Sequence, residues 1–191
     1  YYDPEKAGWE ETVLGSYGGE ITWVSIVKNA ETQKQTWLYN EMEDGTIELV
    51  EYLGEAPLTT FTVPTEVDGK EVTAIGPAVF AGMESLVEVT IPSPVKTIGT
   101  NAFRACSNLN EITISEGVKT IEKKAFFECD GLTQIRIPGT VESLGKMAFA
   151  GCEGLKNVEI SEGVQFIGER AFCECSSLEE IVIPGTVDRI E

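Results

Sequence analysis

The sequence predicts an α/β-type solenoid that is mostly β, in which each repeat forms one turn of a coil. The first observation is a series of phenylalanines spaced 23 residues apart: Phe80, Phe103, Phe126, Phe149 and Phe172. The second is that apolar residues follow each Phe at constant distances: a Cys or Met after three residues, a Leu after six, and Val, Ile or Leu after nine, eleven, fifteen and eighteen. A fixed period of this length is the signature of a solenoid, because one repeat cannot bury its apolar face alone.

Composition narrows the function. The chain of 191 residues has a net charge of −18, which argues against nucleic acid and anionic membrane surfaces as partners. No apolar run approaches the roughly 20 residues of a membrane-spanning helix, so we expect no membrane insertion of this segment. The chain opens at Tyr1 without a signal peptide, which is consistent with a mature or trimmed chain that has lost an export signal. It contains no histidine, so the usual general base and the commonest metal ligand are missing.

Residues 1–56 differ from the rest and are predicted to form a leader and a β-hairpin cap. They hold every Trp and Tyr of the chain, and 12 acidic against 3 basic residues. Residues 1–20 are polar and Gly-rich, residues 21–27 are β-prone, and residues 29–35 resemble a loop. Strands are expected at residues 36–42 and 46–53, about a turn at Asp44-Gly45 that supplies the positive φ a hairpin needs. Such a cap covers the apolar end of a solenoid.

Residues 57–191 are predicted to form the solenoid, with the last repeat incomplete. The first coil begins at Leu58, and five extra residues around 68–71 predict a loop. Each repeat is expected to contain a strand such as 111–114, a second extended piece such as 118–121, and a brief helical turn such as 124–129. Gly131 and Gly154 suit a left-handed residue at the end of that turn. Stacked coils then form a parallel sheet with strands roughly 4.8 Å apart.

A second rhythm of 46 residues runs through the strand ends. They alternate between Ile-Pro and Ile-Ser, and the glycines of the following turns alternate with them: Pro92, Pro138 and Pro184 against Ser115 and Ser161. We expect two turn types of equal length to alternate along this edge.

The repeat, written as Cys106-x-x-Leu109-x-x-Ile112-x-Ile114-x-x-x-Val118-x-x-Ile121-x-x-x-Ala125-Phe126-x-x-Cys129, resembles the BspA-like class of leucine-rich repeats. The Ala-Phe-x-x-Cys element and the 23-residue period distinguish this class from leucine-rich repeats with an Asn ladder. The resemblance covers about residues 57–191. It implies a right-handed leucine-rich-repeat coil in a bacterial cell-surface or secreted protein that acts in adhesion, by binding host proteins or other cells. The chain departs from the pattern at Val79, Met83 and Glu122.

The cysteines and carboxylates have simple structural explanations. Four cysteines at a 23-residue spacing lie in a row, which is no tetrahedral metal cage, and their parallel side chains do not suit a disulfide. We therefore expect buried free thiols, with Cys173 outside this column as the alternative of an exposed, reactive thiol. The carboxylate pairs are interpreted as solvated surface charge, with weak calcium binding by the acidic cap as the alternative. No catalytic residue, metal site or cofactor is predicted.

Alternation along the strands predicts two columns of outward side chains on the main sheet. Leucine-rich solenoids usually bind partners at such positions, so these residues are the candidate partner-binding site: Glu88, Glu111, Gln134, Asn157 and Glu180 in one column, and Thr90, Thr113, Arg136, Glu159 and Val182 in the other. An ordinary solvated sheet face remains the alternative. Phe166 lies in a column that is otherwise polar, so its ring is expected to point to solvent. We include Phe166 among the candidate partner-binding residues, as a contact patch that Phe127 could share.

The leading hypothesis is a non-enzymatic module that binds a host or other cell-surface protein from an extracellular or cell-surface location. The alternative is a structural spacer that projects another domain of a longer protein. The chain stops at Glu191, midway through a coil, which leaves open a cut, a missing tail, or an end-to-end homodimer.

Overall fold

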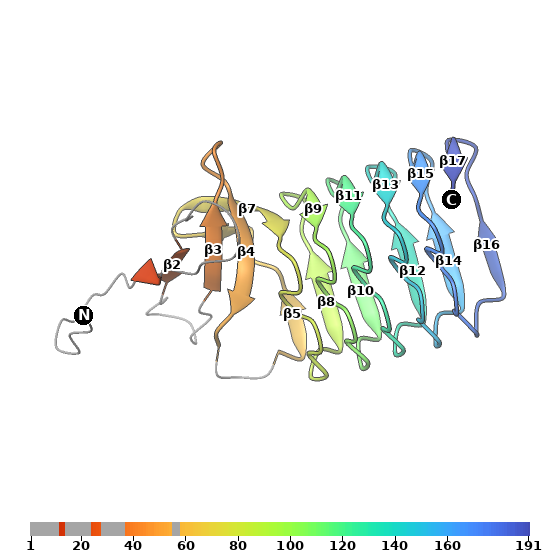
Figure 1. Ribbon diagram of the computed structural model, residues 1–191, viewed down its shortest axis with the longest axis horizontal. Coiled ribbons are helices and arrows are strands. Elements are labelled where there is room, and N and C mark those ends of the chain that lie inside the picture. Colours follow the sequence, from red (N-terminus) through yellow and green to blue (C-terminus); the bar gives the residue numbers. More distant parts are fainter. Residues whose placement is uncertain (1–11, 14–23, 28–36, 55–57) are drawn as a thin grey trace.

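The structure is a computed structural model, and it describes residues 12–13, 24–27, 37–54 and 58–191. Coils of closely similar shape follow one another along its long axis, with the β-hairpin β3–β4 at one end (Figure 1). The polar leader and the loop at residues 29–35 expected from sequence lie almost wholly outside the described residues. No described residue forms a helix that could cross a membrane.

The cap strands are β1 (Thr12–Val13), β2 (Val24–Val27), β3 (Trp37–Glu41) and β4 (Ile47–Tyr52), and successive strands pair antiparallel. Three of the four, β2, β3 and β4, lie within the segments predicted from sequence, whereas β1 lies in the predicted leader. The β3–β4 turn contains Gly45 at φ 82°, and the Asp44 carboxylate accepts hydrogen bonds from the backbone N–H and hydroxyl of Thr46. These bonds lower the pKa of Asp44. Strand β4 then pairs parallel with β7 of the first coil, so the cap and the coils share one sheet.

The first coil contains β5 (Thr60–Thr62), β6 (Glu66–Val67) and β7 (Lys70–Ile75). The five extra residues predicted as a loop form a hairpin instead, because β6 pairs antiparallel with the start of β7. Asp68 and Gly69 both have positive φ, 54° and 73°, which is the geometry of a tight two-residue hairpin turn. The hydroxyl of Tyr39 donates to the Asp68 carboxylate at 2.9 Å, which ties this hairpin to the cap.

Each later coil contributes two strands on two sides of the solenoid. The longer strands are β8 (Glu88–Ile91), β10 (Glu111–Ile114), β12 (Gln134–Ile137), β14 (Asn157–Ile160) and β16 (Glu180–Val182). The shorter strands are β9 (Thr97–Ile98), β11 (Thr120–Ile121), β13 (Ser143–Leu144), β15 (Phe166–Ile167) and β17 (Arg189–Ile190). The shorter strands continue the cap sheet in register from β7 to β17, whereas the longer ones form two parallel three-stranded sheets, β5–β8–β10 and β12–β14–β16.

The brief helical turns expected around each Phe are not found in the part of the chain that the structure describes. Lys124 and Glu128 both adopt left-handed φ values, 56° and 61°, which a right-handed helix cannot accommodate. The intervening backbone instead binds the next coil, because the N–H groups of Lys124, Phe126 and Glu128 donate to carbonyl oxygens 22 residues further along, at 2.8 to 3.0 Å. A helix would direct these N–H groups within its own turn.

Gly131 and Gly154 do not have the left-handed conformation predicted for them; the left-handed position lies three residues earlier, at Glu128 and Gly151. The absence of a side chain at these two positions has another explanation. A Cβ on Gly154 would lie 2.3 Å from the carbonyl oxygen of Asp130 in the preceding coil. Glycine is therefore needed there because the backbones of neighbouring coils approach closely.

The core is a set of ladders that run the length of the solenoid. The rings of Phe80, Phe103, Phe126 and Phe149 are fully buried and stack nearly parallel, with centroids 4.8 to 5.1 Å apart. Trp37 of the cap contacts Phe80 edge-on at 5.9 Å and so begins this ladder. Burial of each such side chain contributes on the order of 1.5–3 kcal/mol before conformational entropy is counted.

The 46-residue rhythm corresponds to two turn types, as expected. Gly117 and Gly163 in the Ser-type turns have φ values of 129° and 117°, which only glycine adopts readily, whereas Gly139 in a Pro-type turn does not have positive φ. The Gly117 N–H donates to the hydroxyl of Thr140 in the next coil at 2.9 Å. Consecutive turns of different type are thus linked to each other.

Candidate functional site on the main sheet face

The main sheet face is the side of the solenoid formed by the longer strands, β8, β10, β12, β14 and β16. These strands position the two columns of side chains predicted from sequence. Val89 and Ile91, with their equivalents in later coils, point into the core, and the residues between them point outward. Nine of the ten predicted column residues are exposed, and Thr90 is half-buried. The alternation read from sequence is therefore confirmed, and the columns cover one side of the solenoid.

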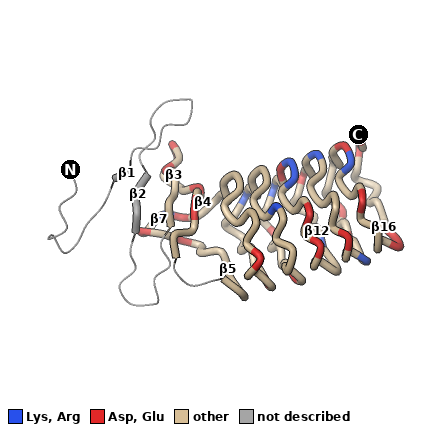
Figure 2. The backbone as a smooth tube through the Cα atoms, turned by 60° about the horizontal axis from the view of Figure 1, so that its bottom comes forward, with Lys and Arg blue, Asp and Glu red and all other residues tan. Residues whose placement is uncertain are grey.

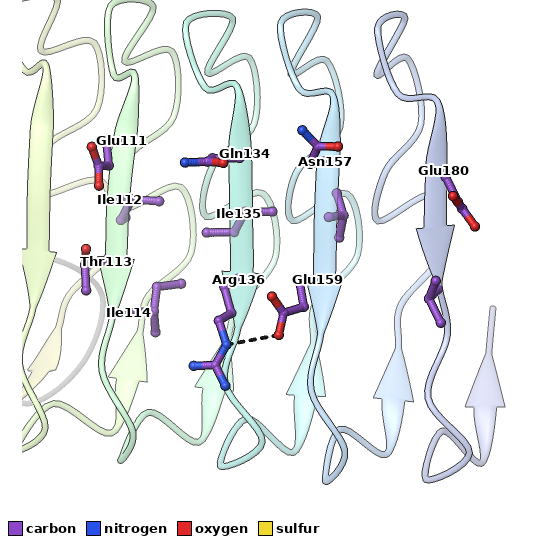
Figure 3. Close-up of a pocket in the computed structure, with 12 residues that line it drawn as sticks. Glu111, Ile112, Thr113, Ile114, Gln134, Ile135, Arg136, Asn157, Glu159 and Glu180 are labelled. Carbon is purple, nitrogen blue, oxygen red and sulfur yellow. Dashed lines mark hydrogen bonds and ion pairs between the residues drawn. The ribbon is translucent and has the colours of Figure 1, made fainter.

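A groove of about 520 Å³ lies across this face over β10, β12, β14 and β16 (Figure 3). Eight of its lining residues belong to the predicted columns: Glu111, Thr113, Gln134, Arg136, Asn157, Glu159, Glu180 and Val182. The sequence did not predict that inward-pointing residues would also line the groove. These are Ile112, Ile114, Ile135 and Val158, which form an apolar floor. The groove therefore combines a polar rim with an apolar base.

The main sheet is interrupted between β10 and β12, under one part of this groove. These strands occupy consecutive coils, yet no ladder pairs them. Ile112 and Ile114 in β10 are 6% and 7% exposed, and Val158 and Ile160 are 7% exposed in β14, which is paired on both sides, whereas Val89 and Ile91 in β8 are fully buried. In a parallel ladder alternate residues bond to opposite neighbours, so Gln134 and Arg136 direct their backbone N–H and C=O groups toward β10 without a ladder partner there.

Pro138 accounts for part of this interruption. In the Ser-type coils, the N–H of Ser115 and Ser161 donates to the carbonyl oxygens of Ile91 and Ile137 in the preceding coil, at 3.0 Å each. Proline has no N–H, so the strand before Pro138 lacks that bond to β10. The Pro-type strand β16 likewise pairs with β14 over three residues, whereas the Ser-type strand β14 pairs with β12 over four. Pairing with the preceding coil is therefore shorter at the Pro-type strand ends, although β8 before Pro92 and β16 before Pro184 keep a ladder of three residues.

Arg136 is the single basic residue of the groove, and acidic neighbours already engage it. Its Nε lies 3.2 Å from Glu159 Oε1 in the next coil, and its Nη1 lies 3.9 Å from Glu116 Oε1 (Figure 3). Both contacts are exposed, so each contributes at most about 1 kcal/mol to stability. Their effect is to neutralise the positive charge of the groove.

A row of four polar side chains crosses the groove from one end to the other. Glu111 and Glu180 stand at the two ends, with Gln134 and Asn157 between them (Figure 3). Within the described residues, none of the four has a side-chain hydrogen bond or ion pair. Two carboxylates and two amides are therefore free to bind a partner.

The structure does not bring Phe166 into this site. Its strand β15 belongs to the cap sheet and not to the main sheet, and the ring is half-buried rather than fully directed to solvent. The Arg189 guanidinium lies over the ring, 4.6 Å from its centroid. Phe127 is similarly half-buried, with the Lys124 ammonium 4.4 Å from its centroid. Cation–π contacts explain how these rings are accommodated at the surface.

The cysteines are free thiols, as expected, and four of them form a row in which Cys106, Cys129 and Cys152 are buried and Cys175 is half-buried. Burial raises the pKa of Cys106 and Cys152 to about 12, so these thiols stay protonated at neutral pH. Cys173 is half-buried and stands outside the row. The part of the chain that the structure describes contains no group of three or more side chains that could hold a metal ion.

A sequence model of the BspA type leucine rich repeat region matches residues 73–191 in six copies. The chain belongs to the BspA-type leucine-rich repeat family. No curated protein sequence matches it. Among solved structures, this BspA-type chain is similar to a leucine-rich repeat protein from Bacteroides capillosus, with 29% identity over 68% of this chain and 97% of that one, and a TM-score of 0.58.

Two longer bacterial proteins are also similar to this BspA-type chain. One is a leucine rich cell surface protein from Faecalibacterium prausnitzii, with 27% identity over 86% of this chain, 50% of that one, and a TM-score of 0.60. The other is the pneumococcal vaccine antigen PcpA, with 25% identity over 87% of this chain, 46% of that one, and a TM-score of 0.71. The chain therefore spans about half the length of these two relatives.

Proposed function

We propose that this chain is a non-enzymatic protein-binding module of a bacterial cell-surface or secreted protein, and that it acts in adhesion. The observation that carries the proposal is the groove on the main sheet face, in which unpartnered polar side chains surround an apolar floor. Binding sites combine an apolar centre with a polar, solvent-accessible rim in this way. The partner is another protein, at the surface of a host cell or of another cell.

Rigidity supports this role. The face rests on buried ladders, and its strands pair in register within each part, β8–β10 and β12–β14–β16, so its backbone is held in place before a partner arrives. A pre-ordered surface loses less conformational entropy on binding. The location at a cell surface draws support from the family and from the Faecalibacterium relative, which is a cell surface protein.

Site-specific photocrosslinking tests the proposal. A benzophenone side chain is placed at Thr113 or Glu159 on the groove, or at exposed Gln165 beside β15 as the matched control. Each protein is incubated with extracellular-matrix and cell-surface proteins and irradiated, and the adducts are identified by mass spectrometry. A purified partner that crosslinks from the two groove positions and not from Gln165 supports the function. Equal adducts from all three positions, or none, favour the structural spacer.

A further inference from the structure

We propose that the groove binds an extended peptide segment with two basic side chains separated by three residues, which lies across the strands along the coil axis. The inference rests on the proposed function and specifies its partner. It is carried by the row from Glu111 to Glu180, whose two carboxylates lack partners among the described residues and flank two free amides.

The spacing of the carboxylates determines the spacing of the basic residues. Glu111 and Glu180 occupy equivalent positions three coils apart. Over the same three coils, from Phe103 to Phe172, successive stacked rings lie 5.0 to 5.5 Å apart, so the two positions are separated by roughly 15 Å. An extended chain rises about 3.3 Å per residue, and alternate side chains share a face. Residues i and i+4 are thus about 13 Å apart on the same face, within reach of both carboxylates. Basic residues at i and i+3, with only two residues between them, would lie on opposite faces of the extended chain.

The amides of Gln134 and Asn157 lie where the peptide backbone would pass. Each carries a carbonyl oxygen and an NH₂ group, so each can both accept from and donate to a backbone amide. Because the peptide crosses the strands at right angles, its backbone cannot join their ladders, and side-chain amides are the groups available to satisfy it. In a β-strand conformation the residue at i+2 then lies midway between the two carboxylates and faces the floor at Ile135 and Val158, which favours an apolar side chain there.

Charge favours a cationic segment over a neutral or acidic one. Arg136 is neutralised by Glu159 and Glu116, which leaves Glu111 and Glu180 as the uncompensated charges of the groove. In Figure 2, the basic segments (blue) lie mainly in the upper turns of the later coils, away from the strands labelled β12 and β16. The net charge of −18 also accelerates encounter with a basic partner at low salt.

Two synthetic peptides of identical composition test the inference. The first, Thr-Lys-Thr-Val-Thr-Lys-Thr, places both Lys and the Val on one face; the second, Thr-Lys-Thr-Val-Lys-Thr-Thr, places the Lys side chains on opposite faces. Binding is measured by fluorescence anisotropy at low ionic strength, with Glu111→Gln/Glu180→Gln as the variant. The control is Glu84→Gln/Glu153→Gln, since these exposed carboxylates are also three coils apart and give the same charge change outside the groove.

The first peptide is expected to bind up to about fivefold more tightly than the second, because it forms two ion pairs where the second forms one. Glu111→Gln/Glu180→Gln should remove that preference, and the control should keep it. Equal binding of both peptides, or equal loss in both variants, would overturn the inference. If the photocrosslinked partner also binds Glu111→Gln/Glu180→Gln as tightly as the unsubstituted chain, the protein-binding function stands and only this specificity fails.

Discussion

The Cys129 thiol donates a hydrogen bond to the backbone carbonyl oxygen of Phe103 in the preceding coil, at a distance of 3.1 Å. The same bond recurs one coil at a time, at 3.1 to 3.2 Å, in the pairs Cys106–Phe80, Cys152–Phe126 and Cys175–Phe149. Each pair is 26 positions apart, which is one 23-residue repeat plus the three-position offset from Phe to Cys. The Phe-x-x-Cys element of the sequence is thus explained by a contact between coils.

Cys129→Ala should lower the free energy of unfolding by about 1–3 kcal/mol, because it removes this bond and leaves a small cavity in a fully buried site. Cys173→Ala is the control, since Cys173 is half-buried and outside the row, and should change stability by about 0.5 kcal/mol or less. Urea denaturation measures both. Equal losses in the two variants would show that the buried row has no special structural role.

Phe126→Ala should cost about 3–5 kcal/mol, because the ring is fully buried between Phe103 and Phe149 in the middle of the ladder. The neighbouring Phe127→Ala removes the same side chain from a half-buried surface site and should cost only about 1 kcal/mol. Chemical denaturation of the two variants compares them directly. A loss under about 1 kcal/mol at Phe126 would contradict an inward-facing Phe column.

Stability should fall as the pH rises above 9. Burial raises the pKa of Cys106 and Cys152 from the usual 9.0 to about 12, and that of Cys129 in the same direction. The folded chain therefore keeps these protons at a pH where the unfolded chain releases them. Cys106 and Cys152 each remove up to about 1.4 kcal/mol per pH unit from pH 9 toward 12, and Cys129 acts in the same direction.

Urea midpoints measured from pH 7 to 10 check this prediction. The unfolding free energy should be insensitive to the thiols below pH 9 and should then decline, with a shallower decline in Cys129→Ala than in Cys173→Ala. Identical slopes in the two variants would indicate that the buried thiols do not cause the loss.

Amide hydrogen exchange should detect the interruption of the main sheet. The backbone N–H groups of Gln134 and Arg136 face β10 without a ladder, whereas those of the equivalent Glu111 and Thr113 face β8 inside one. Exchange at Gln134 and Arg136 should therefore be at least about tenfold faster than at their equivalents. Comparable protection at all four amides would mean that β10 and β12 are joined in solution.

Most of the fold could be predicted from the sequence because its determinants are periodic. The inward columns, the cap hairpin at Gly45 and the exposed face all follow from the spacing of apolar residues and one turn signal. The conformation of the turn around Phe126 could not be predicted correctly from the sequence, because a short apolar run that contains good helix formers has the composition of a helix. Its left-handed residues, Lys124 and Glu128, are not types that mark such a conformation in a sequence.

The candidate site was predicted only in part. Alternation identified the exposed columns, but it treats every coil as equivalent and so cannot predict a gap between two particular strands. The alternating Pro and Ser strand ends were the available signal, because Pro138 lacks the N–H that Ser115 and Ser161 donate. The polar column of Phe166 predicts an exposed ring that could contact a partner. In the structure the guanidinium of Arg189 in the next coil covers this ring.

Residues 23 apart stack in one continuous coil, and nuclear Overhauser effects between aromatic rings test this stacking most directly. The rings of Phe103 and Phe126 have centroids 5.1 Å apart, so their protons should give a strong cross-peak in a chain with labelled Phe. Phe103→Leu and Phe126→Leu assign the two resonances. A cross-peak that disappears in either variant is the predicted result, and its absence from the unsubstituted chain would contradict the stacked coil.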